Sequence, residues 1–257
     1  MSLFTYHMPP FLIVMGVFYL LAAFPILVGF IKDGYWSGVF GEFFSMLRNN
    51  LHWCAGAIAI TFVLIAFVDI PATLAVKHLE IVTQSYTFWD FISSCAEGGF
   101  VGGFLFTLFM LSKQFKWLKL AEVVKISLMS SILGGLSNGI LKFLFNRQRP
   151  SIGLEQWHFF AFFKDGAEQF NNLLYAYNSM PSGHTITTLA AITPFFLAYR
   201  NKFIRTFLLI WALLVCFARV YTINHWLSDV FIASLLGVLI GLASFRVNQK
   251  RLIIRVK

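Results

Sequence analysis

The chain has 257 residues, of which 58% are hydrophobic and only 12% are charged, and its formal net charge at pH 7 is +9. A water-soluble domain carries about 25% charged residues because polar side chains must cover its surface, so this composition excludes an ordinary soluble domain. A basic protein suggests nucleic acid, anionic lipid or an anionic substrate as partner, and the positions of the charges decide among them.

Uncharged apolar runs recur along the chain and predict membrane helices. A helix needs about 20 residues to cross a bilayer, with a usual range of roughly 17–25. The first two runs reach this length alone, and the others reach it with flanking polar or basic residues, whose long stems extend to the interface. The seven runs lie at 11–31, 51–68, 98–112, 126–141, 185–199, 206–218 and 230–245. The predicted fold class is therefore all-α, as a polytopic membrane helix bundle.

The basic residues predict an orientation, because cytoplasmic loops collect Lys and Arg. With the C-terminus in the cytoplasm, the segments on that side are 32–50, 113–125, 200–205 and 246–257, and they hold 14 of the 20 Lys and Arg residues. With the acidic residues counted as well, the inner face carries a net charge of +11 and the outer face −2. Most of the net charge therefore orients the protein in the membrane and indicates no nucleic-acid partner.

This topology divides the chain into three parts. Residues 1–50 are predicted to form an N-terminal membrane helix and a cytoplasmic loop, residues 51–246 a helix bundle with an outer loop at 146–181, and residues 247–257 a basic cytoplasmic tail. No basic residue precedes the first apolar run, so a cleaved signal peptide is not expected. The alternative for this run is a half-inserted or interfacial segment.

Two local patterns add to this outline. Glycines at 134–139 and 237–241 are spaced for close packing of helices. Aromatic residues of the outer loop, among them Trp157, Phe159 and Phe160, indicate a piece that lies at the lipid interface. That piece either shapes access for an acyl or prenyl chain or anchors the loop.

Three clusters of polar and charged residues lie at the ends of the predicted membrane helices, where exposure to lipid would be unfavourable. Such residues commonly belong to a functional site. The first closes the fourth helix at 142–150, the second opens the fifth at 181–184, and the third spans the connection between the sixth and seventh at 219–229. Because successive helices alternate in direction, all three clusters are predicted to lie at one face of the membrane, the outer one.

The cationic members of these clusters have the chemistry to bind phosphate. Lys142, Arg149 and Arg219 can neutralise a phosphoryl dianion, and the two guanidinium groups can donate bidentate hydrogen bonds. Ser182 stands where the N-cap of a helix belongs, so its hydroxyl and the amide of Gly183 would point at an anion.

Two histidines and one carboxylate complete a candidate catalytic set. His225 and Asp229 are one helical turn apart, so we expect the carboxylate to accept one ring N–H. This fixes the tautomer and leaves the other nitrogen to attack phosphorus. His184 would then protonate the leaving oxygen. No metal and no cofactor are needed, because the cations stabilise the developing charge.

Taken in order, K-x6-R-P at 142–150, P-S-G-H at 181–184 and R-x5-H-x3-D at 219–229 resemble the three-part signature of the type 2 phosphatidic acid phosphatases. That superfamily includes lipid phosphate phosphatases, undecaprenyl-pyrophosphate and lipid A phosphatases, glucose-6-phosphatase and vanadium haloperoxidases, and the chain looks like its bacterial membrane lipid phosphatase type. The resemblance implies a six-helix phosphatase core over roughly 51–246, to which the helix at 11–31 is an addition.

The resemblance also implies a role for each motif residue. The phosphate-binding residues are Lys142, Arg149, Ser182, Gly183 and Arg219, and the catalytic residues are His184 as acid, His225 as nucleophile and Asp229 as its orienting partner. The chain departs from the family at one position, because Ala218 stands where the family commonly has Ser before the arginine. Alanine cannot donate the hydroxyl hydrogen bond, so phosphate affinity or the placement of Arg219 is expected to differ while activity is retained.

These residues predict an integral membrane phosphatase that hydrolyses a lipid phosphate or pyrophosphate at the extracytoplasmic face through a phosphohistidine. Its partners are the lipid bilayer and the membrane lipid substrate, and undecaprenyl pyrophosphate, phosphatidylglycerol phosphate, phosphatidic acid and lipid A all stay open. The alternatives are a phosphotransferase that moves the phosphoryl group between lipids and a non-catalytic phospholipid-binding membrane protein. The charge asymmetry favours a bacterial inner membrane with a periplasmic site and a cytoplasmic C-terminus, although an organelle membrane obeys similar rules.

Overall fold

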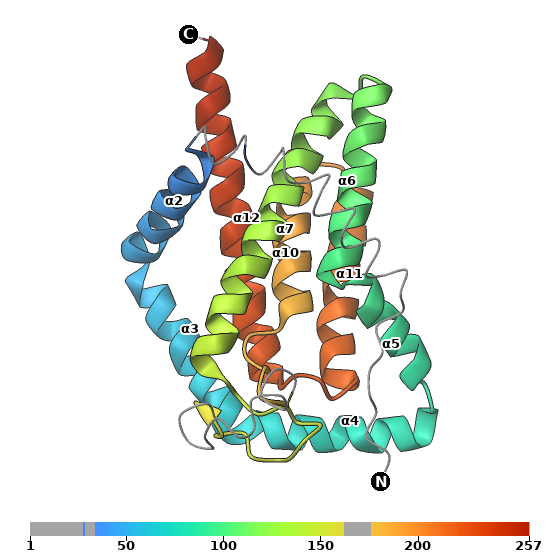
Figure 1. The fold of residues 1–257 in the computed structure, drawn as a ribbon. Helices are drawn as coiled ribbons and strands as arrows, with labels where there is room; N and C mark the ends of the chain where they lie inside the picture. Colours follow the sequence, from blue (N-terminus) through green and yellow to red (C-terminus); the bar gives the residue numbers. More distant parts are fainter. Residues whose placement is uncertain (1–27, 29–33, 162–175, 257) are drawn as a thin grey trace.

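The computed structural model describes residue 28 and residues 34–161 and 176–256. All regular secondary structure in these ranges is helical, which confirms the predicted all-α class (Figure 1). The predicted N-terminal helix at 11–31 falls outside the described residues except for residue 28. In chain order the elements are α2 (Tyr35–Asn49), α3 (Leu51–Val63), the π-helix η1 (Leu64–Val68), α4 (Asp69–Thr83), α5 (Tyr86–Cys95), α6 (Gly98–Gln114), α7 (Leu118–Phe145), α10 (Gly183–Ala198), α11 (Lys202–Tyr221) and α12 (Leu227–Val256).

The predicted membrane spans from residue 51 onward coincide with helices. Four helical stretches of the described chain are long and apolar enough to cross a membrane: Leu51–Thr83, Leu118–Phe145, Lys202–Tyr221 and Leu227–Lys250. A fifth span results if α5 and α6, which meet at a bend of 52°, are counted together, and α10 is apolar but shorter. The chain is therefore an integral membrane protein with several apolar helices.

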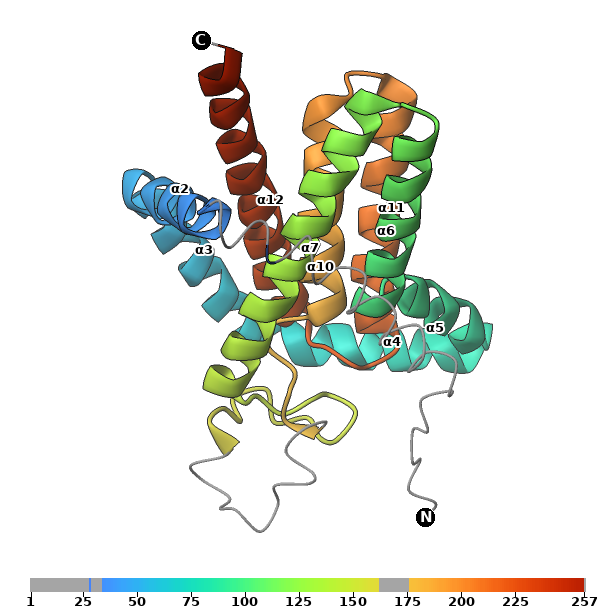
Figure 2. The same cartoon turned by 45° about the horizontal axis from the view of Figure 1, so that its top comes forward.

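The short helix α10 lies in the middle of the bundle, between α7 and α12 (Figures 1 and 2). Glycines allow both neighbours to approach it closely, as the sequence predicts. A Cβ atom on Gly237 of α12 would lie 2.8 Å from the carbonyl oxygen of Ile186, and one on Gly134 of α7 would lie 3.3 Å from the same atom. A Cβ atom on Gly241 would lie 2.9 Å from the carbonyl oxygen of Ala190. The position of α10 therefore depends on backbone contact.

The span predicted at 51–68 continues further than expected. Leu51–Thr83 has 33 residues, which at 1.5 Å per residue is about 50 Å, whereas the hydrocarbon core is about 30 Å thick. Both views show α4 lying across one end of the bundle instead of along it (Figures 1 and 2). The π-helix η1 stands at this transition, and Asp69 begins α4 with a fully buried side chain.

Two segments predicted as cytoplasmic loop and tail are helical. Within 32–50, α2 buries one face against the bundle through Tyr35, Val39 and Met46. Glu42 of α2 pairs with Lys250 of α12, with 2.7 Å between the carboxylate oxygen and the ammonium nitrogen. The predicted tail at 247–257 continues α12 as far as Val256. Burial of an apolar face explains the helix in the first segment, which the charge pattern alone did not reveal.

We predict that Gly241→Ala lowers the melting temperature of the detergent-solubilised protein by several degrees. The new Cβ would lie 2.6 Å from the Cβ of Thr193, and overpacking of this kind costs about 1–3 kcal/mol. Gly56→Ala on α3 is the control, because no atom lies within 4 Å of its added Cβ. Equal melting temperatures for the two variants would contradict the close packing described here.

Candidate active site

The three predicted motifs meet at the end of the bundle that α4 crosses. Lys142 lies in the last turn of α7 and Arg219 in the last turn of α11. Ser182 is the N-cap residue of α10, as predicted. Its backbone N–H donates to the carbonyl oxygen of Asp229 in the first turn of α12, at 3.3 Å. The structure thus places the second motif directly against the third, with His225 in the connection between α11 and α12.

Positive charge surrounds His225, whose side chain is buried. Burial lowers the pKa of His225 well below its usual value of 6.5, and the charges of Arg219, Arg149 and Lys142 lower this pKa further. The same three cations and His225 also interact electrostatically with His184 in the first turn of α10. The structure therefore brings the three predicted phosphate-binding cations and both histidines into one site, with His225 neutral at neutral pH.

The hydrogen bond that fixes the His225 ring is not the one expected. Its Nδ1 lies 2.6 Å from the carbonyl oxygen of Ser179 and 3.8 Å from Oδ2 of Asp229. A carbonyl oxygen only accepts, so Nδ1 must carry the proton and Nε2 keeps its lone pair. The predicted tautomer is therefore held by a backbone atom and not directly by the carboxylate.

Asp229 affects the position of the His225 ring indirectly, through its hydrogen bond with Ser179. Its Oδ2 accepts a hydrogen bond from the Ser179 hydroxyl at 2.5 Å and another from the backbone N–H of Trp226 at 3.0 Å. Its Oδ1 pairs with Nη1 of Arg147 at 2.5 Å. The carboxylate thus fixes the segment whose carbonyl group holds His225. Ser179 precedes the second motif by two residues, and no sequence pattern pointed to it.

Gly183 at the start of α10 allows side chains of α7 to lie close to the helix backbone. A Cβ atom on Gly183 would lie 2.9 Å from Nδ2 of Asn138 and 3.8 Å from Nζ of Lys142. Glycine here therefore leaves the Lys142 ammonium group and the amide nitrogens at the start of α10 side by side. The buried hydroxyl of Ser182 accepts a hydrogen bond from Thr185 at 3.0 Å, and a hydroxyl that accepts one bond can still donate its own hydrogen.

The two arginines of the predicted phosphate site are held by different elements. Nη1 of Arg149 donates to the side-chain oxygen of Asn224 at 3.1 Å. Nη1 of Arg219 donates to the hydroxyl of Ser93 on α5. The sequence predicts that phosphate affinity or the placement of Arg219 differs because Ala218 lacks a hydroxyl. In the structure Ser93, far away in the sequence, supplies a hydroxyl to Arg219. Ser93 lies between the apolar runs at 51–68 and 98–112 and belongs to none of the three motifs.

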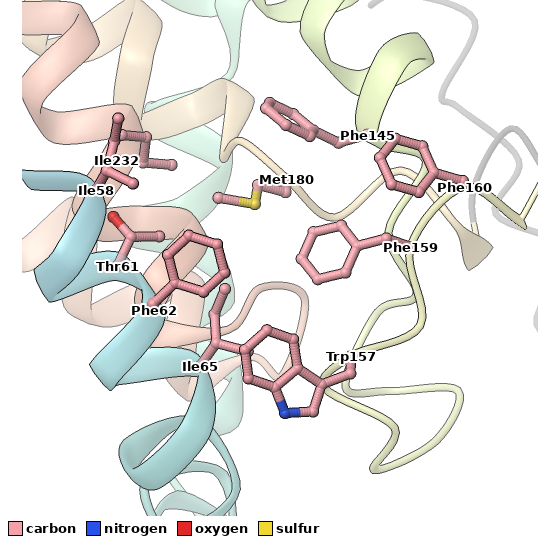
Figure 3. A pocket seen from close by; sticks show the side chains of 10 residues that line it. All are labelled: Ile58, Thr61, Phe62, Ile65, Phe145, Trp157, Phe159, Phe160, Met180 and Ile232. Carbon is pink, nitrogen blue, oxygen red and sulfur yellow. The ribbon is translucent and has the colours of Figure 1, made fainter. Parts of the chain in front are cut away.

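An apolar cavity of about 470 Å³ lies beside these groups (Figure 3). Phe62 of α3 and Trp157 of the segment after α7 stack on one wall, with 6.1 Å between ring centroids. Met180, next to the second motif, and Phe145, at the end of α7, line it as well. Phe159 lines the cavity and also lies over the Arg147 guanidinium group, whose central carbon is 4.9 Å from the ring centroid. The cavity therefore lies next to the second motif and is lined by the ring that covers Arg147.

Among residues 34–161 and 176–256, no group of three His, Cys, Asp or Glu side chains lies close enough to hold a metal ion. The charged groups near His225 are instead the side chains of Lys142, Arg149 and Arg219 and the carboxylate of Asp229.

Comparison with known proteins bears on the family. The model of the PAP2 superfamily matches residues 123–253, which is half of the chain and includes all three motifs. No curated protein matches the sequence.

Two crystal structures resemble the chain. A PAP2-type phosphatidylglycerolphosphate phosphatase from Bacillus subtilis is 19% identical, with a TM-score of 0.53 over 76% of this chain and 96% of that one. LpxE from Aquifex aeolicus is 24% identical, with a TM-score of 0.48 over 64% of this chain and 87% of that one. The first of these supports the helical architecture described above.

We predict that Ser93→Ala weakens binding of inorganic phosphate about 10-fold or more. Removing a hydrogen bond to a charged group costs about 1.5–3 kcal/mol, and Arg219 then loses the hydroxyl that holds it. Binding is measured by calorimetry on purified protein in detergent. Ser94→Ala, which removes the neighbouring exposed hydroxyl, is the control and keeps wild-type affinity. Equal affinities in both variants would show that Ser93 does not place Arg219.

Proposed function

Because the chain belongs to the PAP2 superfamily and combines its three motifs with several apolar helices that could cross a membrane, we propose that it hydrolyses a membrane lipid phosphate or pyrophosphate through a phosphohistidine intermediate. The observation that carries the proposal is the His225 ring, which is neutral, has its Nδ1 proton held by Ser179 and is surrounded by Lys142, Arg149 and Arg219. This arrangement presents a nucleophilic nitrogen to a bound anion.

In the first step Nε2 of His225 attacks phosphorus. The N–P bond forms while the bond from phosphorus to the leaving oxygen breaks, and His184 gives that oxygen a proton. In the second step water attacks phosphorus and gives a proton to His184, the N–P bond breaks, and inorganic phosphate leaves. Both histidines then return to their starting states.

The remaining motif residues are proposed to bind the phosphate. The ammonium group of Lys142 and the guanidinium groups of Arg149 and Arg219 neutralise the phosphoryl oxygens, and the Ser182 hydroxyl and the Gly183 amide donate hydrogen bonds at the start of α10. Since these groups stabilise the charge of the transition state, we expect hydrolysis to need no metal ion and to continue in the presence of a chelator.

The apolar cavity supports a lipid as substrate. Ligand pockets commonly have volumes of 300–1,000 Å³ with apolar walls, and this cavity of about 470 Å³ adjoins the second motif at Met180. We infer that a hydrocarbon chain of the substrate lies there while its phosphate lies beside His225 (Figure 3).

The location of the site supports an extracytoplasmic reaction. The C-terminus lies at the end of α12 opposite to the motifs and α4 (Figure 1). If the basic C-terminal end is cytoplasmic, as the charge distribution predicts, the site faces the other side of the membrane, which in a bacterial inner membrane is the periplasm.

His225→Ala tests the function on the full chain purified in detergent. We expect wild-type protein to release inorganic phosphate from at least one of phosphatidylglycerol phosphate, phosphatidic acid, undecaprenyl pyrophosphate and lipid A, and the variant to lose this release more than about 1,000-fold. His78→Ala, which removes an exposed histidine of α4, is the control.

The same assay separates the alternatives. Label that moves from a labelled lipid to a second lipid, with little free phosphate, would establish a phosphotransferase. Wild-type protein that binds these lipids without releasing phosphate would leave only a binding protein. Release that persists in His225→Ala would refute the proposed nucleophile.

The lowered pKa of His225 predicts the position of the acidic limb of the pH profile. Attack needs the neutral ring, so activity is present above this pKa and is lost as the pH falls through it. We therefore expect the acidic limb of kcat/KM to lie below pH 6.5, the usual value for histidine. Arg149→Gln removes one of the charges that lower this pKa and moves the limb to higher pH, whereas Lys77→Gln on α4 leaves it in place. An acidic limb above pH 7 in the wild type would contradict this assignment.

A further inference from the structure

A second set of buried charged side chains contacts Asp229 through Arg147. Arg147 and Asp69 are both fully buried, and Nη2 of Arg147 lies 2.8 Å from Oδ2 of Asp69. Nη1 of the same guanidinium group lies 2.5 Å from Oδ1 of Asp229 and 2.8 Å from the hydroxyl of Ser228. One cation thus joins a carboxylate at the start of α4 to a carboxylate at the start of α12.

The hydrogen bonds of Arg147 exclude it from the phosphate-binding set. Nε and Nη2 both donate to the carbonyl oxygen of Gln156, at 3.0 and 2.7 Å. With the bonds to Asp69, Asp229 and Ser228, all five N–H donors of the guanidinium group have acceptors. Phe159 and Trp226 cover the group, whose central carbon lies 4.9 and 5.3 Å from their ring centroids. Arg147 therefore has no donor left for a substrate.

Asp69 holds the beginning of α12 as well as Arg147. Its Oδ1 accepts a hydrogen bond from the backbone N–H of Ser228 at 2.9 Å, and its Oδ2 accepts one from the Ser228 hydroxyl at 2.6 Å. A carboxylate at a helix N-terminus is stabilised by the unpaired amides there. The next residue, Asp229, is thereby fixed from its backbone as well as from its side chain.

We propose that Asp69 and Arg147 are positioning residues of the active site. They hold Asp229 in the orientation in which Oδ2 binds the Ser179 hydroxyl, and the Ser179 carbonyl group in turn holds Nδ1–H of His225. The consecutive contacts from Arg147 to His225 are 2.5, 2.5 and 2.6 Å. The proposal rests on the proposed function, because it assigns a role in placing the nucleophile of that reaction.

The role predicts a distinct kinetic effect. Neither residue belongs to the phosphate-binding set, so its loss disturbs the attack by His225 and leaves phosphate binding intact. A variant should therefore lower kcat with little change in KM, whereas loss of a phosphate ligand weakens binding.

The test uses Asp69→Asn in the full-length protein purified in detergent, assayed on the lipid phosphate that the wild type hydrolyses best. Asparagine keeps the size of the side chain but removes its charge and turns one oxygen into a donor that faces Arg147 or Ser228. We expect kcat to fall about 10- to 100-fold, with KM and the inhibition constant of inorganic phosphate within about 3-fold of wild type. Asp90→Asn, which neutralises an exposed carboxylate of α5, is the control and keeps wild-type kcat.

Arg147→Lys and Ser228→Ala extend the test. Lysine keeps the charge but has no planar fork to bridge two carboxylates, so kcat should fall about 100-fold. The double variant Asp69→Asn/Arg147→Lys should lose no more than the worse single variant, because both changes break one chain of contacts. If Asp69→Asn fails to fold, Ser228→Ala, which removes a neutral member of the cluster, takes its place with an expected fall in kcat of about 10-fold.

Three results would overturn the proposal. Wild-type kcat in folded Asp69→Asn would refute the positioning role alone. A rise of KM and of the phosphate inhibition constant in parallel with the loss of kcat would make the pair part of the phosphate site. Wild-type protein that releases no phosphate from any lipid would refute the proposed function and this inference with it.

Discussion

The ion pairs of Arg147 with Asp69 and Asp229 are the interaction on which the arrangement of the site depends. Moving charged groups out of water costs several kcal/mol each unless they are paired and hydrogen-bonded. Arg147 meets this requirement only where α4, the segment after α7 and the start of α12 converge, since each supplies acceptors. The need to satisfy one guanidinium group thus fixes three segments relative to one another at the end of the bundle, among them the start of α4 at Asp69.

Charged groups of both signs lie near the His225 ring. Lys142, Arg149 and Arg219 act on the ring, and Asp229 holds the segment on its Nδ1 side. The three cations repel one another, and a bound phosphate dianion relieves this repulsion, so the site favours a doubly charged anion. These cations disfavour protonation of the His225 ring, so Nε2 keeps its lone pair. The proposed phosphate binding and the proposed activation of His225 therefore both rest on the same distribution of charge.

The sequence predicted the parts of this arrangement that are local. Uncharged runs marked the helices, glycine spacing marked the contacts of α10, and fixed spacing within each motif placed Lys142, Ser182 and Asp229 at helix ends. The long-range contacts were not predictable. Ser93 reaches Arg219 from 126 positions away, and Asp69 belongs to none of the three motifs. The partner of His225 is a backbone carbonyl group, which carries no signal in the side-chain pattern.

The position of the apolar cavity next to the second motif supports the proposal that the substrate is an amphiphile. Met180 lines the cavity and is followed directly in the sequence by Pro181 and Ser182, the N-cap residue of α10. A hydrocarbon group that contacts Met180 would therefore lie close to the amides at the start of α10. Each Å² of apolar surface removed from water contributes about 25 cal/mol, and a soluble phosphate monoester without a chain gains none of this. Phe159 connects the cavity with the buried ion pairs, because its ring lines the cavity and also lies over Arg147. In the proposed function, the apolar chain of the substrate therefore contributes binding energy at a wall that includes the ring lying over Arg147.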